Sequence, residues 1–226
     1  MTKPFDPHPS PASSELGRYS GPEAYALADW RRRIFTLYAQ IREMADPAQA
    51  HAHWLDVRSA MFRDHPMSPL PEDQRADFAG IACAPYDPAF RFSVRLRTIA
   101  GDSLSYDLAR DGTMRARPIA TTEGLADALG GELMVLWIEG YGGGMFIPFT
   151  DATSGAGASG VRSYGGGRYL ADAIKGSDLG LAPDGRLIVD FNFAYNPSCA
   201  LSDAYVCPLS PPENRLKGAV LAGETV

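Results

Sequence analysis

The sequence predicts an α+β fold in which an N-terminal helical hairpin packs on an antiparallel β-sheet. Two amphipathic helical patterns come first, and a series of strand patterns separated by turn signals follows them. Because strands follow one another without intervening helices, we expect the sheet to be antiparallel and curled into a sandwich or partial barrel. We expect one domain over residues 20–226, with the C-terminal segment wrapped back across the sheet. A proline- and serine-rich, flexible tail is expected over residues 1–19.

The first helix is expected to begin at Ser20, because Glu23 follows it at the spacing of a capping box. Its apolar stripe recurs every three or four residues, at Leu27, Trp30, Ile34, Leu37, Ile41 and Met44. The Asp46-Pro47 pair ends this helix and begins a second one, since proline disfavours helix before it and suits the first helical position. The basic triplet at residues 31–33 is interpreted as a solvated helix face rather than a phosphate-binding track.

The strand patterns begin with "FRFSVRLRTI", whose alternation of apolar and polar residues predicts a half-exposed strand. The segment "SLSYDLARDGTMRARPI" predicts two strands joined at Asp111-Gly112, the two-residue hairpin signal. A short helix or turn is expected in "TTEGLADALG", and strands in "ELMVLWIEG", "GMFIPFT" and "GRLIVDFNFAY". Prolines at 197, 208, 211 and 212 favour an extended, turn-rich C-terminal segment.

Composition argues against several classes of protein. The 226 residues carry a formal net charge of -6, so we expect no nucleic-acid partner. The longest apolar run, "LMVLWI", is far too short to cross a bilayer, and the N-terminus has no signal-peptide core. We therefore expect a cytoplasmic protein with no membrane association. No motif indicates a cofactor, and any protein partner is left unspecified.

The segment Tyr-Gly-Gly-Gly occurs twice, which raises the question of whether glycine holds an anion or only shapes turns. The first copy begins at Tyr141. It lacks the third glycine of a dinucleotide-binding fingerprint, because Met145 occupies that position. A hairpin corner in which Tyr141 folds over a neighbouring strand is therefore favoured.

The second copy, Tyr164 to Gly167, is followed by Arg168 and by "YLADAIKG", which predicts a short helix. Glycine N–H groups beside a guanidinium suit a carboxylate or phosphate ligand. The alternative is that Arg168 forms a structural ion pair with one of three carboxylates, Asp151, Asp172 or Asp190. The segment "TDATSGAGASG" between the two copies is either a mobile loop over a site or a plain connection.

Evenly spaced polar residues near the C-terminus give the best argument for a site. Asp190, Asn192 and Asn196 would share one face of a strand, which either lines a cavity or faces solvent. We expect Arg168 to converge on this face. If a reaction occurs there, the acid or base would be one of three carboxylates, Asp151, Asp190 or Glu213.

The cysteines and histidines predict no metal site. Cys199 and Cys207 are too far apart for a zinc-ligand pair, and they are interpreted as half-buried thiols, with a disulfide or redox pair as alternatives. His51 and His53 would lie on different helix faces, both at the surface. His65 follows the second helix, where it would either stabilise a turn or act as an acid/base group.

Several motifs together resemble one family. They are "GGMFIPFTDATSG", "SYGGGRYL", "VDFNFAYNPSCA" and "VCPLSPPENRL" with a later "AGE", preceded by "FRDHPMSPL" and "FAGIACAPYDPAFRF". The chain resembles the bacterial and archaeal domain-of-unknown-function family 1684 over roughly residues 20 to 224. Cys83 and Ala84 depart from the aromatic residues expected there. The resemblance implies a single domain and assigns no activity, and it marks ten positions without a role: Asp151, Tyr164, Arg168, Asp190, Asn192, Asn196, Cys199, Cys207, Asn214 and Arg215.

Two classes of function follow from these observations. In the first, the protein binds a small anionic molecule through Tyr141, Tyr164, Gly165, Gly166, Gly167, Arg168, Asn192, Asn196, Asn214 and Arg215, and a hydrolase or lyase acting on a small metabolite is a variant of it. In the second, the same motifs lock the fold of a non-catalytic module whose exposed edge binds a protein.

Overall fold

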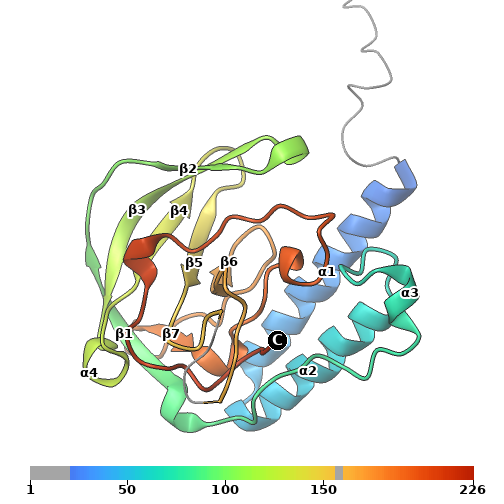
Figure 1. Ribbon diagram of the computed structural model, residues 1–226. Coiled ribbons are helices and arrows are strands. Elements are labelled where there is room, and N and C mark those ends of the chain that lie inside the picture. The colour runs from blue at the N-terminus through green and yellow to red at the C-terminus, as the bar shows by residue number, and fades with distance from the viewer. Residues whose placement is uncertain (1–20, 156–159) are drawn as a thin grey trace, which may run out of the picture.

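The computed structural model describes residues 21–155 and 160–226 (Figure 1). The predicted cap Ser20, the predicted tail and the middle of the glycine-rich loop lie outside the described residues. Two long helices come first, α1 (Gly21–Glu43) and α2 (Pro47–Asp64), followed by the short α3 (Glu72–Arg75). The predicted helical hairpin is therefore confirmed.

Local chemistry explains the turn between the two helices. The Asp46 side chain accepts hydrogen bonds from the backbone N–H groups of Ala48 and Gln49, at 2.9 and 3.4 Å, and Pro47 takes the first helical position. The helices are also joined directly, since Trp54 Nε1 donates to Tyr38 Oη at 3.1 Å.

The sheet is antiparallel throughout, with the strand order β6-β5-β4-β3-β1-β7 and β2 paired beside β3. Its strands are β1 (Arg91–Thr98), β2 (Leu104–Asp107), β3 (Thr113–Glu123), β4 (Met134–Ile138), β5 (Gly144–Phe149), β6 (Arg168–Asp172) and β7 (Leu187–Asp190). Beyond β7, Tyr195 pairs with Tyr169 of β6, so the sheet nearly closes into a barrel. The predicted α+β fold with a partial barrel is confirmed.

Strand alternation divides the interior into two apolar clusters. On β4 and β5, Val135, Ile147 and Phe149 join the cluster inside the curled sheet. Their neighbours Leu136 and Phe146 point the other way and pack with the apolar stripe of the hairpin, which includes Leu37 and Trp54 (Figure 1). The hairpin thus covers the outer face of the sheet.

The C-terminal segment wraps across the sheet as expected. Leu216 N donates to Thr150 O at 2.9 Å, Gly218 N to Leu129 O at 2.8 Å, and Glu224 N to Ala194 O at 2.9 Å. Leu129 belongs to α4 (Ala126–Leu129), which forms where a short helix or turn was expected. None of the helices in the described part of the chain has both the length and the apolar character needed to cross a membrane.

Several local predictions were wrong. A 3₁₀ turn (Ala109–Asp111) separates β2 from β3, so the hairpin is confirmed but its turn is longer than Asp111-Gly112 alone. The segment after Gly167 forms strand β6 rather than a helix, because it pairs with β5. His51 is buried rather than at the surface, since its ring packs against the rings of Trp54 and Phe193.

The strand predicted in "GRLIVDFNFAY" ends early. The Asp190 side chain accepts a hydrogen bond from Asn192 N at 3.0 Å, which turns the chain into a 3₁₀ helix (Phe191–Phe193). Asp190, Asn192 and Asn196 therefore do not alternate along one strand face, although all three are buried.

Candidate functional site

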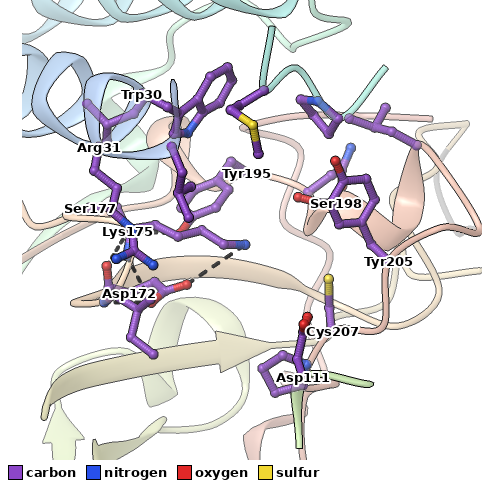
Figure 2. Close-up of a pocket in the computed structure, with 18 of the residues that line it drawn as sticks. Trp30, Arg31, Asp111, Asp172, Lys175, Ser177, Tyr195, Ser198, Tyr205 and Cys207 are labelled. Atoms are coloured by element: carbon purple, nitrogen blue, oxygen red, sulfur yellow. Dashed lines mark hydrogen bonds and ion pairs between the residues drawn. The ribbon is translucent and has the colours of Figure 1, made fainter. Parts of the chain in front are cut away.

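The main pocket lies between the helical hairpin and the sheet (Figure 2). Its volume is about 280 Å³, just below the range of ordinary ligand sites, so it suits a small molecule. Apolar side chains from α1, α2, β4 and β5 form most of its wall, among them Trp30, Ile34, Phe62, Ile138 and Phe146. Such a lining suits an apolar ligand body.

Polar groups gather on one side of this pocket. Lys175 Nζ lies 3.9 Å from the buried carboxylate of Asp172, too far for a direct hydrogen bond, and the lysine side chain is 37% exposed. Figure 2 shows the Arg31 side chain extending from α1 toward the same carboxylate. Burial raises the pKa of Asp172 against the opposing effect of Lys175, so its ionised form is disfavoured relative to a carboxyl in water. Two cations, Lys175 and Arg31, thus lie near one carboxylate on this side of the pocket.

A buried arginine forms part of the pocket wall. The Arg58 guanidinium pairs with Glu224 and lies over the rings of Trp54, Phe62 and Tyr195, at 4.4, 5.3 and 5.2 Å from their centroids. Since Glu224 balances its charge and aromatic faces surround it, Arg58 belongs to the framework of the pocket.

Two thiols lie at the edge of the pocket. The OH group of Tyr164 donates to Cys199 Sγ at 3.6 Å, and Cys199 N donates to Cys207 Sγ at 3.4 Å. Both cysteines are half-buried and free, and Cys207 lines the pocket.

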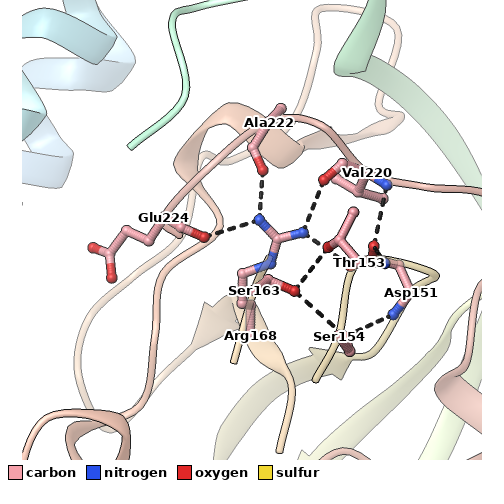
Figure 3. Close-up of polar contacts among 8 residues, drawn as sticks. All are labelled: Asp151, Thr153, Ser154, Ser163, Arg168, Val220, Ala222 and Glu224. Carbon is pink, nitrogen blue, oxygen red and sulfur yellow. Dashed lines mark hydrogen bonds and ion pairs between the residues drawn. The ribbon is translucent and has the colours of Figure 1, made fainter. Parts of the chain in front are cut away.

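Arg168 was predicted to hold a ligand, and the structure surrounds it with protein groups (Figure 3). It is 1% exposed, and Nη2 contacts Asp151 Oδ2 at 2.9 Å. The same guanidinium donates to three carbonyl oxygens of the C-terminal segment, those of Val220, Ala222 and Glu224. Asp151 in turn accepts from Val220 N at 3.2 Å. This arrangement fits the structural ion pair that was the alternative interpretation.

Asp190 and Asn192 have other partners. Asp190 Oδ2 pairs with Arg91 at 2.7 Å, and Asn192 Nδ2 donates to Asp87 O at 2.8 Å while its Oδ1 accepts from Asp87 N. The structure thus brings Asp190 and Asn192 together but pairs neither with Arg168. Of the residues selected from sequence, Asn196 lines the main pocket.

The remaining selected residues are dispersed. Asn214 is buried and bridges β4 and β5, since its Nδ2 donates to the carbonyls of Met134 and Pro148 at 2.9 and 2.7 Å. Glu213 and Arg215 are exposed. Tyr141 is also fully exposed on the β4–β5 turn, so it does not fold over a neighbouring strand as predicted.

The second glycine triplet packs tightly against the C-terminal segment. Gly167 has a φ of 97°, and a Cβ atom there would lie 2.6 Å from Phe149 O and 2.9 Å from Ser210 Cβ. Ser210 N also donates to Gly166 O at 3.2 Å. Close backbone approach therefore accounts for glycine here without a ligand.

Two further predictions concern metals and histidine. Within residues 21–155 and 160–226, no group of three or more His, Cys, Asp or Glu side chains is arranged to hold a metal ion. His65 stabilises a turn, because its Nδ1 accepts a hydrogen bond from Met67 N at 3.0 Å.

Comparison with known proteins agrees with the motifs. Residues 76–225 match the model of a family described as "Protein of unknown function (DUF1684)". The chain belongs to the DUF1684 family. None of the curated proteins matches it. The solution NMR structure of an uncharacterized protein of Haloarcula marismortui is similar, with 32% identity and a TM-score of 0.53, over 79% of this chain and 92% of that one. Membership in DUF1684 therefore identifies the family of this chain and assigns it no activity.

Sequence reasoning missed most of the main pocket. Asp172 ends strand β6 and Lys175 lies in the turn after it, in a segment that was predicted to be helical. Arg31 and Arg58 lie on helices whose packing on the sheet no local pattern reveals. One signal was present, because Trp30 and Ile34 belong to the apolar stripe that was recognised as needing a second layer.

Proposed function

We propose that this DUF1684 protein binds a small organic acid with an apolar body in the pocket between the hairpin and the sheet. The observation that carries the proposal is the Lys175 ammonium group. It faces an otherwise mostly apolar cavity and lies 3.9 Å from Asp172, so it keeps donor capacity for a ligand. A carboxylate placed there gains a charge-assisted hydrogen bond, and the ligand's body displaces water from aromatic walls.

The position of Lys175 supports this role. Its ammonium group lies 5.2 Å from the ring centroid of Tyr169 and 6.0 Å from that of Tyr195, and the residue lines the pocket. Arg31 adds a second cation on the same side, whereas Asp111 lies apart from Asp172 and Lys175, on the turn between β2 and β3 (Figure 2). Ser177 and Asn196 provide further polar groups for orientation.

Binding rather than catalysis is the function that this geometry favours. The three carboxylates considered as acid/base groups, Asp151, Asp190 and Glu213, are not among the residues lining the pocket. A cytoplasmic location is part of the proposal, and the three free cysteines are consistent with a reducing compartment.

The test is a thermal-unfolding screen with small aromatic and branched aliphatic carboxylates, each compared with its uncharged amide. A ligand at a hundred times its Kd adds about 2.7 kcal/mol to the free energy of unfolding. We expect carboxylates to raise the Tm of the wild type and the amides to leave it unchanged.

The matched variants are Lys175→Met and Lys217→Met. Lys217 is exposed and does not line the pocket, so Lys217→Met should respond to carboxylates as the wild type does. Lys175→Met should lose the response. The proposal is refuted if no acid raises the Tm, or if acids and amides raise it equally. It is also refuted if Lys175→Met responds to acids as strongly as the wild type does.

A further inference from the structure

Cys199 and Cys207 are brought together by the local fold. Cys199 lies in a 3₁₀ turn (Ser198–Ala200), and the chain then loops out and returns so that Cys207 Sγ accepts the backbone N–H of Cys199 at 3.4 Å. Tyr164, from the second glycine segment, adds its hydroxyl at 3.6 Å from Cys199 Sγ. Three segments that are separate in sequence thus converge on one pair of thiols.

The surroundings make the two thiols unequal. A hydrogen bond from Cys207, with further contributions from Tyr164 and the charge of Lys175, lowers the pKa of Cys199 to about 6 against the opposing effect of burial. The same hydrogen bond and burial raise the pKa of Cys207. Cys199 is therefore the more acidic thiol of the pair. Cys83 differs, because burial raises its pKa to about 12.

The pair is also accessible, and no helix or strand holds residues 201–206 between the two cysteines. Both cysteines are half-buried, and Cys207 lines the main pocket, through which a small molecule can approach. The residues between them, 201–206, form turns with no helix or strand, and Asp203 is exposed. We infer that the chain there adjusts to the sulfur–sulfur distance that a disulfide requires.

We propose that Cys199 and Cys207 form a thiol–disulfide exchange site whose substrates are small, low-molecular-mass disulfides. Cys199 is the attacking nucleophile, Cys207 is the resolving thiol, and the Tyr164 hydroxyl stabilises the thiolate. This site is additional to the proposed acid-binding function and does not depend on it.

The exchange proceeds in two balanced steps. The Cys199 thiolate attacks one sulfur of the disulfide RS–SR, forming a mixed disulfide Cys199–S–SR and releasing RS⁻. The released thiolate takes the proton of Cys207, becoming RSH, and the Cys207 thiolate then attacks Cys199 Sγ. A Cys199–Cys207 disulfide forms and a second RS⁻ leaves. The protein dithiol is oxidised by two electrons, and one RSSR is reduced to RSH and RS⁻.

The experiment treats the whole protein with 2-hydroxyethyl disulfide at neutral pH and follows intact mass and peptide maps. The wild type is expected to lose two mass units and to link Cys199 to Cys207. Cys207→Ser should stop at the mixed disulfide on Cys199, and Cys199→Ser should form neither product. Cys83→Ser, the matched control, should react as the wild type does.

A second measurement separates a reactive pair from two packed thiols. The rate of iodoacetamide alkylation at Cys199 should follow a titration with a midpoint near pH 6, since the thiolate is the reacting form. Tyr164→Phe should shift that midpoint upward and leave alkylation of Cys83 unchanged. Three unreacted thiols after disulfide treatment, or an unshifted midpoint in Tyr164→Phe, would overturn the proposal. Neither readout depends on whether an acid binds the pocket.

Discussion

Arg168 joins strand β6 to the C-terminal segment through one guanidinium group. It contacts Asp151 at 2.9 Å and three backbone carbonyls between Val220 and Glu224, and it lies 5.2 Å from the centroid of the Phe149 ring. A planar group with five donors can serve several acceptors at once, which a lysine cannot do in the same geometry. Burial lowers the pKa of Arg168 against the opposing effect of Asp151. The residue therefore depends on this set of acceptors to remain charged in the interior.

At this scale we predict that Arg168→Ala destabilises the protein by about 3–5 kcal/mol, because it leaves the Asp151 carboxylate buried without its partner. Urea unfolding followed by circular dichroism measures the change. Arg215→Ala is the control, since Arg215 is exposed and has none of these contacts, and it should unfold close to the wild type. A stable Arg168→Ala protein would contradict the structural role.

The sequence identified this residue but not what it does. Arg168 and Asp190 stand in conspicuous polar motifs, and such motifs look the same whether they bind a ligand or lock a loop. The deciding information is the position of Val220 to Glu224, fifty or more residues away, which no local pattern contains. The buried His51 was missed for the same reason, since its aromatic partner Phe193 comes from a distant turn.

At the scale of elements, a single carboxylate organises the start of α4. Glu132 Oε1 accepts the N–H groups of Gly124, Leu125 and Ala126, at 2.9 to 3.0 Å, and Oε2 accepts the Thr122 hydroxyl at 2.6 Å. Burial raises the pKa of Glu132, but these hydrogen bonds together outweigh it and hold the pKa below its usual value. The carboxylate thus satisfies backbone donors that the four-residue helix cannot satisfy itself.

We predict that Glu132→Gln destabilises the protein by about 1 kcal/mol at neutral pH, because neutral acceptors bind N–H donors more weakly. Since the pKa of Glu132 is lowered on folding, its contribution is complete above pH 4.5 and is lost as the pH falls through the folded value. The difference between variant and wild type should therefore shrink in acid. Denaturant unfolding from pH 7 to pH 3 measures it, with the exposed Glu123→Gln as the control. A difference independent of pH would contradict the assignment.

Elements with strong local signals were predicted well. The hairpin of α1 and α2 follows from its apolar stripe and the Asp46-Pro47 turn, and the alternation in β1 gave its strand. Prediction failed where side chains compete with the backbone pattern. Asp190 turns the chain out of β7 by accepting Asn192 N, and β6 is a strand only because β5 lies beside it.

For the whole molecule, the Arg58–Glu224 pair connects the two layers. Arg58 comes from α2, and Glu224 comes from the C-terminal segment that crosses the sheet, where its Oε2 also accepts Asn196 N at 2.8 Å. Both side chains are under a tenth exposed. Removal of one partner leaves an uncompensated charge between hairpin and sheet.

We predict that Glu224→Gln alone destabilises the protein by about 3 kcal/mol, since glutamine cannot balance the Arg58 charge. The double variant Arg58→Met/Glu224→Gln should recover part of that loss, because methionine fills the aromatic surroundings without a charge. Unfolding free energies of the two single variants and the double variant form the cycle that measures the coupling. If the change in unfolding free energy of the double variant equals the sum of the two single changes, Arg58 and Glu224 do not interact directly.

The placement of Val220 to Glu224 has a consequence for how the polypeptide is made. A ribosome produces Arg58 long before Glu224, the carboxylate that balances its charge, and Arg168 long before the three C-terminal carbonyls that accept its hydrogen bonds. Until those last acceptors emerge, the hairpin and the barrel cannot close on each other without burying an unpaired Arg58 and leaving N–H donors of Arg168 without acceptors. Nascent chains interrupted before residue 220 should therefore stay open and be susceptible to proteases, so that only finished copies survive.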